Sequence, residues 1–108
     1  MPIYNKLVRD LIPAIIEKDG KALKARNLSE EEYVTELNKK MHEELKEYEE
    51  AENQKQAVEE LADLLELIYA AVRVHGSSVE ELETIRKKKA EKRGGFDERI
   101  FLIEVEDE

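Results

Sequence analysis

The sequence contains no cysteine and no tryptophan, and aromatic residues make up only 6% of its 108 residues. Without cysteine, the chain can form no disulfide and no thiolate metal site, and it has no cysteine nucleophile. No apolar run approaches the roughly 20 residues that a membrane-spanning helix needs, and the start has no signal-peptide-like apolar segment. We therefore expect a cytoplasmic protein without a membrane partner, whose chemistry depends on oxygen and nitrogen groups.

The sequence also has no excess of positive charge. It contains 18 Lys and Arg residues and 27 Asp and Glu residues, for a net charge of −9. Residues 29–66 carry fourteen acidic and four basic groups, whereas residues 86–93 carry one acidic and six basic groups. A nucleic-acid polymer is disfavoured as a partner because proteins that bind one usually present a dominant basic face. An acidic cluster can instead hold divalent cations that bridge to the phosphates of a small molecule.

Glycine and proline are scarce, with four and two residues, and no internal repeat or low-complexity linker interrupts the chain. These features predict a single helical domain over residues 1–108. The expected helices cover roughly Val8 to Lys18, Glu30 to Ala51, Gln56 to Val74 and Ser78 to Gly94.

Helix starts are marked by Ser29 with Glu32 and by Ser78 with Glu81, both with the spacing of a capping box. Pro13 is expected to split or delay the first helix. Residues 96–105 alternate enough to form a short strand or an extended arm.

The second and third helices are long and their connection is short, which makes them antiparallel neighbours. The third helix carries an apolar arc wider than one amphipathic stripe needs, so it is expected to contact neighbours on two sides. A chain of this size buries only roughly 60 to 68% of its unfolded surface. We therefore predict an all-α, antiparallel four-helix bundle assembled as a dimer or a dimer of dimers, with a short extended C-terminal arm.

Two acidic residues of the third helix fall on or beside its apolar face, where acidic residues are not needed for solubility. At about 100° per residue, Glu60 falls in the middle of the arc that contains Leu64 and Leu67, and Asp63 falls at its edge. Glu66 lies on the opposite, polar side. Carboxylates buried among apolar groups cost several kcal/mol each unless they are protonated, paired or bound to a metal.

The second helix supplies matching acids, because Glu44 and Glu47 flank its apolar stripe. An antiparallel hairpin can turn this pair toward Glu60 and Asp63, so that four carboxylates converge. Such a group cannot stay fully ionised without cations, since each carboxylate raises the pKa of its neighbours. All-oxygen ligation favours Mg²⁺, with Mn²⁺ as a substitute.

A carboxylate-bridged di-iron bundle is the nearest rival to a magnesium site, and it would use Glu-x-x-His pairs. Lys39 precedes His42 at that spacing and Val72 precedes His75, so neither histidine completes such a pair. Both histidines are therefore expected at the surface or at helix ends rather than on a metal.

The acids and their flanking segments resemble a known family. Glu43-Glu44-x-x-Glu47 followed by Glu60-x-x-Asp63 resembles the signature of the all-α nucleoside triphosphate pyrophosphohydrolases of the MazG-like superfamily. The segments YNKLVRDLIP, ELADLLELIYA and RKKKAEKRGGFDERIFL are similar to those of its phosphoribosyl-ATP pyrophosphohydrolase-like branch. The resemblance spans nearly the whole chain.

This resemblance implies that Glu44, Glu47, Glu60 and Asp63 bind Mg²⁺, and that Glu43 acts as a further ligand or as a base that orients water. It also implies cleavage of a nucleotide substrate between the α and β phosphates, which gives a monophosphate and pyrophosphate. In such metal-assisted hydrolysis, the cation neutralises the phosphate oxygens and activates the attacking water.

Basic residues offer candidate phosphate contacts in two segments, with Lys6 and Arg9 near the start and Lys89 and Arg93 near the end. Each has an alternative role. The last two suit a helix C-terminus, where cations complement the helix dipole, and the first two could pair with acids or with a neighbouring subunit.

No base-binding pocket is legible in the sequence. Tyr48 and Tyr69 could stack on a base or simply contribute to packing. The alternative to an enzyme is a non-enzymatic, oligomeric helical interaction module, in which the buried acids pair with basic groups of another subunit and set the register of assembly.

Overall fold

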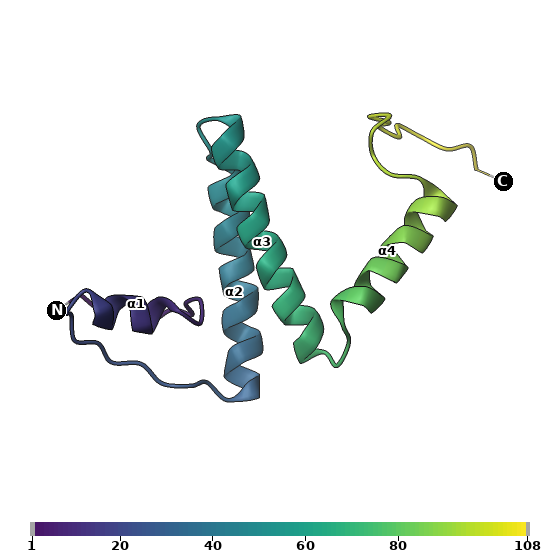
Figure 1. Cartoon of the computed structure of the whole chain (residues 1–108). Coiled ribbons are helices and arrows are strands. Elements are labelled where there is room, and N and C mark those ends of the chain that lie inside the picture. The colour runs from purple at the N-terminus through teal and green to yellow at the C-terminus, as the bar shows by residue number, and fades with distance from the viewer. Residues whose placement is uncertain (1, 108) are drawn as a thin grey trace.

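The computed structural model describes residues 2–107, which form four helices and no strand. The helices are α1 (Ile12–Lys18), α2 (Glu30–Glu49), α3 (Gln54–Val74) and α4 (Val79–Arg93). Figure 1 shows α2 and α3 side by side as an antiparallel hairpin, with α1 to the left of the hairpin and transverse to it, and α4 diverging from the far end of α3. This confirms the all-α fold. Within residues 2–107, no helix has both the length and the apolar content needed to cross a membrane.

The start of α2 confirms the capping box expected from the sequence. The Oγ of Ser29 accepts a hydrogen bond from the backbone N–H of Glu32 at 3.2 Å, and the Glu32 carboxylate accepts one from the N–H of Ser29 at 3.0 Å. Arg26 also donates two hydrogen bonds to this carboxylate, at 3.2 and 2.7 Å. The Arg26 guanidinium is the main reason that the pKa of Glu32 falls to about 2, and the N–H of Ser29 adds to it.

The other helix boundaries differ slightly from the expected ones. α1 begins at Ile12 because Pro13 suits only the first turn of a helix, so the proline delays the helix rather than splitting it. α3 begins at Gln54, earlier than expected, because the side chain of Asn53 caps it by accepting a hydrogen bond from the N–H of Gln56 at 2.8 Å. α4 begins after Ser78, whose Oγ accepts from the N–H of Glu81 at 3.1 Å.

The C-terminal segment is an arm and not a strand. α4 ends at Gly94, whose φ of 81° lies in the left-handed region that favours glycine. Residues 95–107 form neither a helix nor a strand. The large apolar side chains of this arm are all exposed, namely Phe96, Ile100, Phe101, Leu102, Ile103 and Val105.

The chain is open rather than compact. Its radius of gyration is 18.7 Å, whereas a compact domain of this length has one of about 13 Å. Its accessible surface is 10259 Å², against about 6200 Å² for a compact protein of this mass. Among the described residues, Leu37 is the single apolar side chain that is fully enclosed. One chain alone therefore builds the α2–α3 hairpin but hardly any core.

Candidate metal and phosphate site

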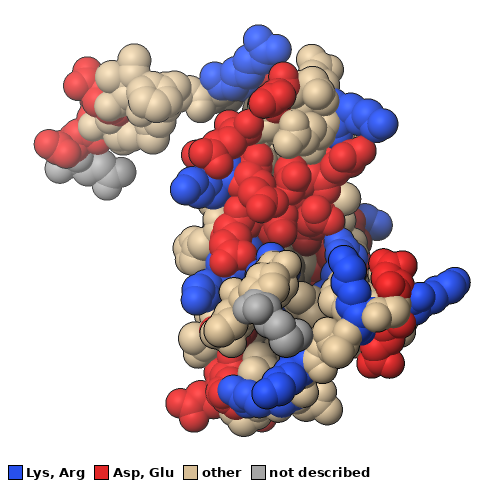
Figure 2. Space-filling model, turned by 90° about the vertical axis from the view of Figure 1, so that its left-hand side faces the viewer, with Lys and Arg blue, Asp and Glu red and all other residues tan. Residues whose placement is uncertain are grey.

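Three carboxylates converge on the α2–α3 hairpin, namely those of Glu44, Glu47 and Glu60. One oxygen from each lies within 4.8 Å of the others. Glu44 and Glu47 are three residues apart on α2, so they share one side of that helix, and the antiparallel α3 brings Glu60 opposite them. We call these three residues the carboxylate cluster. Figure 2 shows the continuous acidic patch on this face of the hairpin, with Lys and Arg side chains at its borders.

Burial differs among the members of the carboxylate cluster. Glu44 is 9% exposed and is the one charged residue among the described residues that is classed as buried. Glu60 is half-buried, and Glu47 is exposed. The Oε2 atoms of Glu44 and Glu60 are both enclosed without a hydrogen-bond partner. Buried acceptors without partners are costly, so these two oxygens are the feature of the site that a bound cation would satisfy.

The carboxylates perturb one another electrostatically. Loss of hydration on burial is the largest cause that raises the pKa of Glu44 to about 7, followed by the contact with the Glu60 carboxyl group and the negative charge of Glu47. The contact with Glu44 lowers the pKa of Glu60, but burial and the contact with Glu47 outweigh it, so that this pKa is raised as well. The site therefore resists full ionisation unless positive charge is supplied.

Asp63 lies beside the carboxylate cluster but is held differently. Its Oδ1 accepts a hydrogen bond of 2.6 Å from Nη2 of Arg9 in the N-terminal segment. Its negative charge still contributes to the raised pKa of Glu44 and Glu60, so it is close enough to act on them. The sequence predicted four converging carboxylates, and the structure brings three together, with the fourth in an ion pair.

The remaining candidate residues fall into two groups. Glu43 and Lys6 line a small pocket between α2 and the N-terminal segment. Lys89 and Arg93 belong to the last turns of α4, and Figure 1 shows that this end stands well apart from α2 and α3. Within one chain, these two cations are not brought to the carboxylate cluster.

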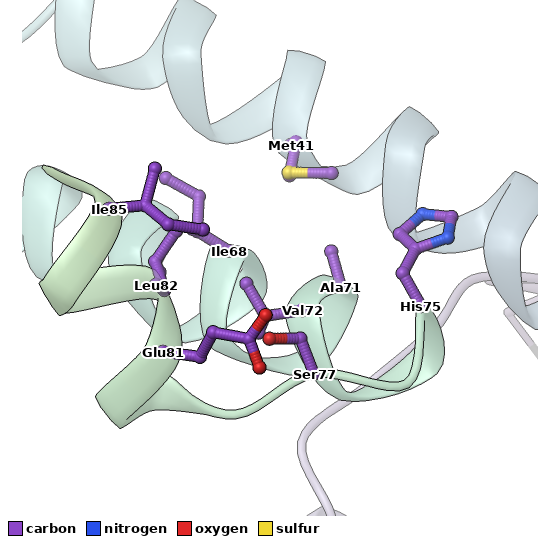
Figure 3. Close-up of a pocket in the computed structure, with 9 residues that line it drawn as sticks. All are labelled: Met41, Ile68, Ala71, Val72, His75, Ser77, Glu81, Leu82 and Ile85. Atoms are coloured by element: carbon purple, nitrogen blue, oxygen red, sulfur yellow. The ribbon is translucent and has the colours of Figure 1, made fainter. Parts of the chain in front are cut away.

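Neither histidine joins the carboxylates. His42 is exposed on α2, and His75 lines a cavity of about 370 Å³ between α3 and α4. Figure 3 shows that this cavity is walled mainly by apolar side chains, among them Met41, Val72 and Leu82. None of the cluster carboxylates lines it, so it is a separate feature of the molecule.

The donor set is suited to one kind of ligand. Carboxylate oxygens alone, with two of them enclosed and unpartnered, match the preference of hard divalent cations such as Mg²⁺ and Mn²⁺. The fold and the site thus define a class, that of all-α proteins with a cluster of carboxylates on an antiparallel helix pair.

The family is narrower than that class. The family model described as "Phosphoribosyl-ATP pyrophosphohydrolase" matches residues 8–90, which contain all four helices except the last residues of α4, together with the carboxylate cluster. The chain therefore belongs to this family, which lies within the MazG-like superfamily, as the sequence resemblance predicted. Comparison with curated proteins and with solved structures gave no match. Membership of the family supports a pyrophosphohydrolase enzyme.

Proposed function

We propose that this protein is a Mg²⁺-dependent nucleotide pyrophosphohydrolase, with Mn²⁺ as a possible substitute. In this proposal, it cleaves a nucleoside triphosphate or a phosphoribosyl-ATP-like substrate between the α and β phosphates, releasing a monophosphate and pyrophosphate. The observation that carries the proposal is the convergence of three carboxylates with two enclosed, unpartnered oxygens in a chain of this family.

Glu44, Glu47 and Glu60 would hold the cation, with Asp63 as a fourth ligand through Oδ2 while its Oδ1 stays paired with Arg9. When bound, the cation would supply charge neutralisation of the phosphate oxygens and lower the pKa of water. The protein's own groups would perform the remaining work. The hairpin fixes the carboxylates in place, and Glu43, exposed one residue before Glu44, would orient the water or serve as its base.

The proposed role is removal of surplus or noncanonical nucleotides from the cytoplasmic pool. In this proposal, the phosphates would be recognised by the cation held on the carboxylate cluster and by the nearby basic groups. Tyr48 is exposed on α2, and Tyr69 is half-buried on α3, so both remain candidates for stacking on a base. The assay below therefore tests which nucleotide the protein prefers as its substrate.

Self-association as a dimer or a dimer of dimers is the second part of the proposal. Large apolar side chains lie exposed on the hairpin at Leu45, Tyr48, Val58, Leu61 and Leu65. At helical spacing, they continue the apolar lining of the α3–α4 cavity. The excess of 10259 Å² over the surface of a compact monomer is about 4000 Å², which exceeds the roughly 1200–2000 Å² that a stable complex buries in total.

The test of the proposed activity is pyrophosphate release from a panel of nucleoside triphosphates and phosphoribosyl-ATP. Malachite-green detection with added inorganic pyrophosphatase reports pyrophosphate, and omission of that enzyme reports any directly released phosphate. We expect release from at least one substrate with Mg²⁺ and none in a reaction run with EDTA, in which the protein is heat-inactivated before excess Mg²⁺ and the pyrophosphatase are added. Absence of metal-dependent release across the panel would favour the helical interaction module, in which the acids pair with basic groups as Asp63 does with Arg9.

A further inference from the structure

A second, smaller pocket adjoins the carboxylate cluster, between the N-terminal segment and α2. Its volume is about 110 Å³, and its walls are Tyr4, Asn5, Lys6 and Leu7 on one side and Glu36, Lys39, Lys40 and Glu43 on the other. We call it the lysine pocket. Three of the residues that line it are lysines, and they come from two segments of the chain, with Lys6 more than thirty residues before Lys39 and Lys40.

The lysines of this pocket are not neutralised by carboxylates. Within residues 2–107, the ion pairs closer than 4.0 Å are Arg9–Asp63, Arg26–Glu32 and Arg86–Glu83. Lys6, Lys39 and Lys40 take part in none of them, although Glu36 and Glu43 line the same pocket. With three positive and two negative charges, the pocket keeps a net positive charge and free N–H donors, which favours an anion.

The N-terminal wall of the lysine pocket is held in place. Arg9 ties this segment to Asp63 of α3 through the 2.6 Å hydrogen bond. The ammonium of Lys6 lies 5.6 Å from the centre of the Tyr4 ring, within the range of a cation–π contact. The first contact ties the segment to α3 and the second orients the Lys6 side chain within the segment, so less conformational freedom would be lost when a ligand binds.

The pocket is next to the carboxylate cluster along α2. Glu43 lines the pocket, and the following residue, Glu44, belongs to the cluster. Lys40 is four residues before Glu44, which places the two on the same helix face one turn apart. A phosphate chain bound at the carboxylate cluster could therefore extend toward these ammonium groups.

We propose that the lysine pocket binds the phosphoryl group of the substrate that departs as part of pyrophosphate. This inference rests on the proposed function and deepens it, since it assigns Lys6, Lys39 and Lys40 as phosphate-binding residues. Of these, only Lys6 carries a sequence signal; Lys39 and Lys40 look like ordinary surface lysines of an amphipathic helix until the N-terminal segment is placed against them.

The test measures binding of inorganic pyrophosphate by isothermal titration calorimetry, in Mg²⁺-containing buffer, to the full-length protein. We expect K39A/K40A to weaken binding by about ten-fold or more, since charge-assisted hydrogen bonds to the phosphate oxygens would be lost. The matched control is K87A/K88A on α4, which removes the same charge from an adjacent pair of lysines. Lys6→Ala, outside any helix, provides a second variant that carries no risk to the hairpin.

Retention of wild-type affinity in both K39A/K40A and Lys6→Ala would overturn the inference. So would an equal loss in K87A/K88A, which would mean that net charge alone governs binding, or a lack of binding by the wild-type protein. The nucleotide panel separates this result from the proposed function. Metal-dependent hydrolysis with unchanged pyrophosphate affinity in the variants would contradict only the proposed role of the lysine pocket. Lysine-dependent binding without hydrolysis would contradict only the proposed enzyme activity.

Discussion

Nη2 of Arg9 lies 2.6 Å from Oδ1 of Asp63. A residue of the N-terminal segment therefore forms an ion pair with an acid that the sequence predicts as a metal ligand. Both side chains are partly exposed, and an ion pair of this kind typically contributes less than about 1 kcal/mol to stability. Its importance is positional. It places positive charge next to the carboxylate cluster and fixes the segment that forms one wall of the lysine pocket.

Replacement of Arg9 by Met should increase the stabilisation that Mg²⁺ provides. Without the guanidinium, Asp63 adds its charge to the carboxylate cluster, which raises like-charge repulsion in the metal-free protein and frees a ligand for the cation. Thermal unfolding with EDTA and with Mg²⁺ measures the difference between the two melting temperatures. Arg26→Met, which breaks the exposed pair with Glu32, is the control and should leave that difference unchanged. A smaller difference in Arg9→Met would contradict the prediction.

Replacement of Glu60 by Gln should abolish turnover while the fold is kept. It removes a carboxylate from the centre of the site, where one oxygen is enclosed without a partner. The metal-free variant is expected to be more stable than the wild type, because crowded negative charge is relieved. Steady-state hydrolysis and thermal unfolding provide the two measurements. Glu66→Gln, on the exposed side of the same helix, should behave as wild type, and near-normal turnover in Glu60→Gln would exclude Glu60 from the mechanism.

The metal-free protein should lose stability as the pH rises from 5.5 to 8. The pKa of Glu44 is raised from 4.5 to about 7 in the folded state, so the proton binds the folded protein more tightly than the unfolded one. The stabilisation is complete below the ordinary pKa and is lost as the pH passes the raised value, with a total of about 1–3 kcal/mol. Urea unfolding in EDTA measures it.

Glu44→Gln is the control for this pH dependence, because it lacks the Glu44 carboxyl group and keeps every other titratable group. Its free energy of unfolding should change less between pH 5.5 and 8 than that of the wild type. Glu32 does not interfere, since its pKa is lowered to about 2 and the stability it provides is lost only in strong acid. An equally steep pH dependence in both proteins would remove Glu44 as the cause.

Replacement of Leu61 by Glu should shift the protein toward the monomer. Leu61 lies 43% exposed on the apolar face of the hairpin, and a charge there would have to be buried in any interface that covers the face. Sedimentation velocity over a range of concentrations measures the change in mass. Ala62→Glu, one residue further and exposed on the polar side of α3, should leave assembly unchanged. A wild-type protein that stays monomeric throughout would contradict the proposed association.

Hydrophobic periodicity and helix-capping residues predicted most of the fold, because both are features of short stretches of the sequence. Ser29 and Glu32 form the expected box, and the long periodic segments form the expected hairpin. Pro13 delays α1, as one of the two expected outcomes. Asn53 was the missed cap, although asparagine before a helix is itself a known signal.

The candidate site was predictable only in part. Placement on helix faces brought Glu44, Glu47 and Glu60 together correctly, since two antiparallel helices fix which sides meet. The ion pair of Asp63 depends on where a segment without regular structure runs, and no periodicity encodes that path. The same reason hides the lysine pocket, and the divergence of α4 separates Lys89 and Arg93 from the acids.

The two most deeply buried residues within residues 2–107, Leu37 and Glu44, lie seven residues apart on one face of α2. The most buried part of the chain therefore adjoins the site proposed for its cation, whereas most small domains have an apolar core at such a position. Loading the cation would then complete the interior itself. Depletion of magnesium would then lower the stability of the protein as well as its activity. Its lifetime in the cell would therefore depend on the supply of metal.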